Sequence, residues 1–247
     1  MLLCGLFAGA LATSAGAATL QIDSFGRNDL ATAKTALQTF KAAPTAGKLV
    51  KSFRTENFES SSAWNGSSGT RNPVTTVGSF VSAGGTGHAG DTINGGKLLQ
   101  VRNDNPLRST RYDTNGGSNW LDSNDTLGMN WEVGGLPKFN AIAFLLTDVA
   151  DQGARFSLDV GGSLFGTIGD GSRFADGGIY LVRVLLPESV SSLSIAMLND
   201  KLNDGFGIDE AMVAQIAPVP VPPAALLMLT GIAGIAGLRR RRAARPA

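Results

Sequence analysis

The chain has 247 residues, of which 43% are hydrophobic and 17% are charged. Its 32 glycines and 10 prolines favour a turn-rich β protein over a helical one, because both residues interrupt helices. Five of its 21 basic residues are arginines at or beyond position 239, which leaves 16 basic residues against 20 acidic ones elsewhere. This balance excludes the basic face that a nucleic-acid-binding protein needs.

Residues 1–17 form an apolar segment without a charged residue, and it ends in Ala15-Gly16-Ala17. A small-x-small pattern after an apolar run is typical of a signal peptide. We therefore expect export through the Sec machinery and cleavage by signal peptidase before Ala18. A buried N-terminal helix is the alternative interpretation, since no basic residues precede the apolar run.

Residues 18–51 predict an N-terminal strand followed by an accessory helix. Apolar residues recur there near helical spacing, at Leu30, Ala33, Leu37 and Phe40. Asp29 stands directly before them, where an aspartate side chain caps a helix well. We expect this segment to precede the main domain.

Residues 52–217 predict a single β-sandwich domain. Short apolar runs alternate with clusters of glycine, asparagine, aspartate and serine, which is typical of an antiparallel sandwich or jelly roll. The expected strands are 52–58, 77–81, 97–102, 108–112, 130–133, 141–147, 155–160, 163–168, 179–186, 192–198 and 207–213. Gly161-Gly162 predicts the two-residue turn of a hairpin.

Residues 218–247 predict a membrane-directed tail. A proline-rich segment from Pro218 to Pro223 leads into an uncharged run, 224–238, which ends at four arginines. A helix of about fifteen residues rises only about 22 Å, which is marginal for a hydrocarbon core of about 30 Å. Arginines stay on the cytoplasmic side, so the preceding domain would face away from the cytoplasm.

This tail resembles the PEP-CTERM sorting signal, in particular its Val-Pro-Leu-Pro-Ala variant. The matching residues are Val219, Pro220, Val221, Pro222 and Pro223, with the terminal cluster Arg239, Arg240, Arg241 and Arg242. The resemblance implies processing by a membrane-embedded exosortase-type transpeptidase at the surface of a Gram-negative bacterium that makes exopolysaccharide. A plain tail anchor that is never processed is the alternative.

The stretch 138–213 is similar to the sandwich domains often found upstream of such signals. Two motifs carry this likeness, a Phe-x-x-Thr-Asp strand at Phe144–Asp148 and an Asp-Gly-Phe-Gly-x-Asp strand at Asp204–Asp209. The resemblance implies no particular biochemical activity for the domain.

The sequence predicts no catalytic residues and hence no enzyme. His88 is the only histidine and Cys4, in the leader, the only cysteine, so zinc sites and histidine-dependent nucleophilic catalysis lack their residues. Carboxylates are more plentiful, and a structural calcium site would take Asp148, Asp204 and Asp209 if the strand ends converge. No cofactor other than this calcium ion is expected.

Aromatic residues suggest a second kind of site. Trp64, Tyr112, Trp120 and Trp131 would suit a carbohydrate-stacking platform, and Trp120 stands in a polar loop setting. The sequence thus predicts an exported cell-surface or extracellular-matrix protein of structural or interaction type, anchored transiently in the inner membrane. The alternative is an exopolysaccharide-binding module, stabilised by calcium.

Overall fold

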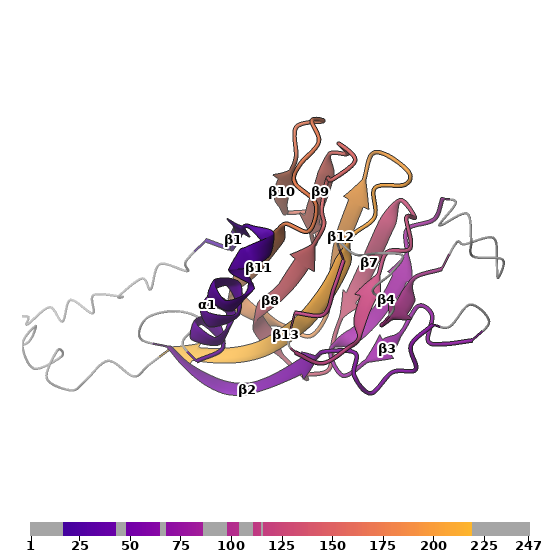
Figure 1. Ribbon diagram of the computed structural model, residues 1–247. Coiled ribbons are helices and arrows are strands. Elements are labelled where there is room, and N and C mark those ends of the chain that lie inside the picture. The colour runs from indigo at the N-terminus through magenta and orange to yellow at the C-terminus, as the bar shows by residue number, and fades with distance from the viewer. Residues whose placement is uncertain are drawn as a thin grey trace, which may run out of the picture.

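The computed structural model describes residues 17–42, 48–64, 68–85, 98–103, 111–114 and 116–218. Within these ranges the protein consists of two antiparallel β-sheets and one short α-helix with a preceding 3₁₀ turn (Figure 1). This arrangement confirms the predicted all-β sandwich.

The larger sheet, sheet A, has the order β1-β11-β8-β13-β6-β5, and β2 also pairs with β13. Its strands are β1 (Thr19–Phe25), β2 (Lys48–Glu56), β5 (Gln100–Arg102), β6 (Trp120–Asp122), β8 (Phe139–Thr147), β11 (Ile179–Val190) and β13 (Gly207–Pro218).

The smaller sheet, sheet B, has the order β10-β9-β12-β7-β4-β3. Its strands are β3 (Val74–Thr75), β4 (Gly78–Ser82), β7 (Gly128–Val133), β9 (Phe156–Val160), β10 (Leu164–Ile168) and β12 (Leu193–Asn199). Figure 1 shows the two sheets packed face to face.

The main core fills the space between the sheets. On β8, Ile142, Phe144 and Leu146 belong to this core, because alternate side chains of a strand point to the same face. The intervening Ala141, Ala143 and Leu145 are also fully buried, on the outer face of sheet A. That second apolar face requires a cover of its own.

The cover is helix α1 (Leu30–Ala42), which follows the 3₁₀ turn η1 (Arg27–Asp29). Its buried residues Ala33, Leu37 and Phe40 pack on the outer face of sheet A, beside β8 and β11 (Figure 1). Strand β1 pairs along its whole length with β11. The sandwich therefore starts at Thr19, whereas the sequence placed residues 18–51 ahead of it.

Most predicted strands are confirmed within a few residues, and three details differ. Arg111 and Tyr112, from the expected strand 108–112, lie in no strand, whereas the short strands β3 and β6 were not predicted. The β9–β10 hairpin is confirmed, but Val160 pairs with Leu164, so its turn has three residues. Gly161 and Gly162 both adopt positive φ there, at 61° and 70°.

Several predicted features fall on residues outside the described ranges. These are residues 1–16 of the leader, His88, Val219, Pro220, Val221, Pro222, Pro223, Arg239, Arg240, Arg241 and Arg242. Among the residues that the structure does describe, no helix has both the length and the apolar character needed to cross a membrane.

Candidate functional site

A pocket of about 300 Å³ lies on the outer face of sheet A and contains Trp120. Leu121 points into the core, so its neighbours in β6, Trp120 and Asp122, point to the opposite face. We call this the Trp120 pocket, and its lining residues are Asn103, Tyr112, Asp113, Gly117, Ser118 and Trp120.

Two aromatic residues form the apolar part of the Trp120 pocket. Trp120 is only 3% exposed, and its Nε1 has no acceptor among the described residues. Tyr112 is half-buried, donates its hydroxyl to the Gly177 carbonyl at 3.1 Å, and has its pKa raised by burial. The pocket therefore combines aromatic rings with the polar side chains of Asn103, Asp113 and Ser118.

The other two predicted aromatic residues do not join this pocket. Trp131 is fully buried in the main core, stacked on Phe80 with ring centroids 5.0 Å apart. Trp64 lies under the guanidinium of Arg102, whose Cζ is 4.3 Å from the ring centre. The expected four-residue stacking platform is thus not formed, and only Trp120 and Tyr112 come together.

Beside the pocket lies a buried network of ion pairs that the sequence did not reveal. Arg111 reaches Asp122 at 3.1 Å, Asp125 at 2.8 Å and Asp148 at 3.4 Å. Arg102 reaches the second oxygen of Asp122 at 2.7 Å. We call these five residues the arginine cluster.

Burial alone would lower the pKa of Arg111, but the carboxylates of Asp122, Asp125 and Asp148 outweigh it and raise that pKa. Arg102 and Asp122 are 1% and 0% exposed. Charges so far from water must be paired with one another, and here they are. The ion pairs of the cluster thereby link β5, β6 and the segment 111–114 to Asp148, directly after the end of β8.

The three predicted calcium ligands are engaged with different partners. Asp148 belongs to the arginine cluster and also accepts a hydrogen bond from the Gly177 amide at 2.9 Å. Asp209 accepts hydrogen bonds from Thr114 N and Oγ1 at 2.8 and 2.9 Å. Burial raises the pKa of Asp209 well above its usual range, although these hydrogen bonds oppose the shift.

Asp204, the third predicted ligand, accepts a hydrogen bond from the Ala154 amide at 2.6 Å and faces Asp151. Within the described ranges, no three histidine, cysteine, aspartate or glutamate side chains are grouped so that they could hold a metal ion. The structure therefore does not bring Asp148, Asp204 and Asp209 together as one carboxylate set.

The chain matches no family model, no curated protein and no solved structure. What the site can do must therefore follow from its own residues. The Trp120 pocket offers a carboxylate, an amide and a hydroxyl beside aromatic rings. These are the groups that hold a small polyhydroxylated ligand.

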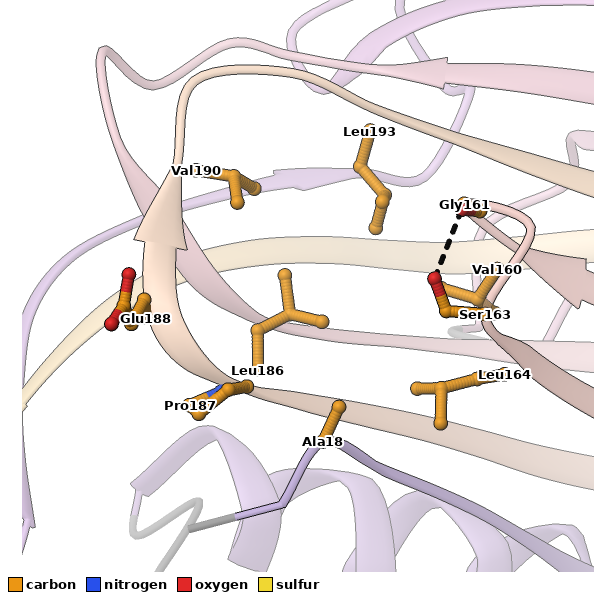
Figure 2. Close-up of a pocket in the computed structure, with 10 residues that line it drawn as sticks. All are labelled: Ala18, Val160, Gly161, Ser163, Leu164, Leu186, Pro187, Glu188, Val190 and Leu193. Carbon is orange, nitrogen blue, oxygen red and sulfur yellow. Dashed lines mark hydrogen bonds between the residues drawn. The ribbon is translucent and has the colours of Figure 1, made fainter. Parts of the chain in front are cut away.

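A second pocket, of about 280 Å³, opens between the sheets at the β9–β10 turn. Figure 2 shows Leu164, Leu186 and Leu193 converging on it, while Glu188 points away. Ala18, directly before β1, also lines it. Its lining is mostly apolar, so this pocket is an opening into the core with little polar chemistry.

Proposed function

We propose that this is an exported structural or interaction protein of the bacterial cell surface or extracellular matrix. The positions of the first and last strands support the proposal best. Strand β1 begins at Thr19, directly after the expected cleavage position before Ala18, and β13 ends at Pro218, where the proline-rich signature begins. Processing at both places would leave every described strand intact.

Two further observations agree with a structural role. The arginines of the arginine cluster are paired with carboxylates, so their charges hold loops in place. Two-sheet sandwiches, jelly rolls among them, are also common in cell-surface and lectin domains. We include in the proposal the C-terminal membrane helix, its exosortase-type processing and the PEP-CTERM relationship, which rest on the sequence alone.

Mass spectrometry of the protein from a Gram-negative host with an exosortase-type enzyme tests the proposal. We expect a new N-terminus at Ala18 and loss of the residues beyond the proline-rich signature. Replacing Arg239, Arg240, Arg241 and Arg242 by glutamine should block only the C-terminal event. Full-length protein in the cytosol with both ends intact would overturn the proposal.

The Trp120 pocket favours a second candidate function, binding of exopolysaccharide. Saccharides are held by aromatic rings next to amide, carboxylate and hydroxyl groups, and Trp120, Tyr112, Asn103, Asp113 and Ser118 provide this set. The proposal differs from the predicted flat platform, because Trp120 is almost wholly buried.

Glycan-array binding would test this second function. Trp120→Phe and Asp113→Ala should each weaken binding, whereas Phe165→Ala should not, because Phe165 is an exposed aromatic residue of sheet B outside the pocket. Thermal melting of each variant would show that the fold is kept. Self-association without glycan binding would favour the structural role alone.

A further inference from the structure

Six aspartates are buried near one end of the sandwich, where β6 and β8 end and β13 begins. They are Asp122, Asp125, Asp148, Asp151, Asp204 and Asp209. The arginine cluster uses both of its cations on Asp122, Asp125 and Asp148, and Asp209 is held by three hydrogen bonds. Asp151 and Asp204 remain, on two neighbouring loops.

These two carboxyl groups face each other, and each has one oxygen without a hydrogen-bond donor among the described residues. Asp204 Oδ2 accepts a hydrogen bond from the Ala154 amide at 2.6 Å, and Asp151 Oδ2 accepts one from Gln152 at 2.7 Å. The remaining oxygens, Asp151 Oδ1 and Asp204 Oδ1, are buried and have no hydrogen-bond donor within the described residues. The two carboxyl groups are within hydrogen-bonding reach of each other.

Asn199 supplies an independent observation at the same place. Its amide nitrogen donates to the main-chain carbonyl of Asp204, so its side chain lies against that residue. Asn199 is only 5% exposed, and its Oδ1 is buried and likewise lacks a donor among the residues described. A proton shared between Asp151 and Asp204 would satisfy the carboxyl pair but not this amide oxygen.

Arg111 is close enough for its charge to lower the pKa of Asp204, and two further nearby cations, Lys201 and Arg173, bind neutral oxygens. Lys201 Nζ donates to the Gly153 carbonyl at 2.6 Å, and Arg173 Nε donates to the Asp151 carbonyl at 3.2 Å. Burial, and then the charge of Asp151, raise the pKa of Asp204 to about 6.

We propose that Asp151, Asn199 and Asp204 bind a calcium ion between the β8–β9 and β12–β13 loops. Two carboxylate oxygens and one amide oxygen are the hard ligands that calcium prefers, and its other ligands would be main-chain carbonyls and water. The site shares only Asp204 with the set expected from the sequence. It does not depend on export or on glycan binding.

Thermal melting and isothermal titration of the purified full-length chain, treated with EDTA and kept near pH 7.5, test the site. At about 10 mM calcium we expect the melting temperature to rise by roughly 3 °C, and magnesium to have a smaller effect. Asp204→Asn and Asp151→Asn should each abolish the calcium effect. The control Asp176→Asn, an exposed position outside the site, should keep it.

Two results would overturn the site. The first is a wild-type chain that shows neither heat of binding nor a melting shift with calcium. The second is a calcium shift that survives both Asp151→Asn and Asp204→Asn, because the ion would then bind elsewhere. If one of these variants fails to fold, the other and the wild-type titration still decide.

Discussion

Arg111 and Asp122 form a hydrogen-bonded ion pair of 3.1 Å, although Arg111 is only 5% exposed and Asp122 is wholly buried. The same carboxylate pairs with Arg102 through its other oxygen. Asp122 therefore joins the two arginines, one in β5 and one in the segment 111–114, to the end of β6. The pair lies on the same face of β6 as Trp120.

Removing Arg111 should destabilise the protein strongly. Arg111→Ala removes the cation that pairs with the buried Asp125 and Asp148, and breaking a buried ion pair from one side costs about 3–5 kcal/mol of unfolding free energy. Urea denaturation would measure the loss. Arg155→Ala, at an exposed arginine, is the control and should change the free energy by less than about 0.5 kcal/mol. Equal effects of both substitutions would contradict the structural role of the cluster.

The pKa of Asp204 predicts a pH dependence of stability in calcium-free buffer. Its folded pKa of about 6 lies above the ordinary value of 3.8, so the folded state favours the protonated form. The stability that Asp204 contributes is complete below about pH 4 and is lost as the pH rises through 6. Asp204→Asn removes this titration.

The measurement is the unfolding free energy of wild type and Asp204→Asn between about pH 4 and pH 7, with EDTA present. Relative to the variant, the wild type should lose on the order of 2 kcal/mol across this window. The raised pKa of Asp209 acts in the same direction but is common to both chains. A difference between the chains that stays constant with pH would refute the assignment to Asp204.

Helix α1 should contribute to stability through its buried face alone. Leu37 is 1% exposed against the outer face of sheet A, so Leu37→Ala should cost about 2–4 kcal/mol of unfolding free energy. Gln38, one residue further along the helix, is exposed. Gln38→Ala should therefore have little effect in the same chemical denaturation. A small cost for Leu37→Ala would mean that the helix is not a required cover of the sheet.

The strands were predictable because their signal is local. Phe156, Leu158 and Val160 alternate with polar residues, and all three are in the main core, as the period-2 pattern predicts. The end of β11 was not predictable in this way. The sequence places the end of this strand near 186, whereas β11 continues through Pro187 to Val190 with a register irregularity against β8.

The site was predictable only in part. Trp120 and Tyr112 were both singled out by residue type, and they do line one pocket. The arginine cluster was not found, because a charged residue in a short strand looks like a solvent-facing one. Alternation places Arg102 and Asp122 only on the face opposite to the core residues Val101 and Leu121. Their pairing depends on the contact of β5 with β6, which no local pattern specifies.

Gly205 provides a test of how tightly the arginine cluster is packed. A Cβ at this position would lie 2.5 Å from Asp125 Oδ1 and 2.7 Å from Arg111 Cζ, both held by ion pairs. Gly205→Ala should therefore destabilise the protein by about 1–3 kcal/mol through overpacking.

A double-mutant cycle would show how much of that cost comes from the contact between Gly205 and Arg111. Arg111→Ala removes one of the atoms that a Cβ at Gly205 would meet, so Gly205→Ala should cost clearly less in the Arg111→Ala background than in the wild type. The expected coupling free energy is about 1 kcal/mol, measured by urea denaturation of the four chains. Because both single substitutions act on the same packed group, their effects cannot be independent if the structure is right. Strict additivity would show that Gly205 and Arg111 are not in contact in solution.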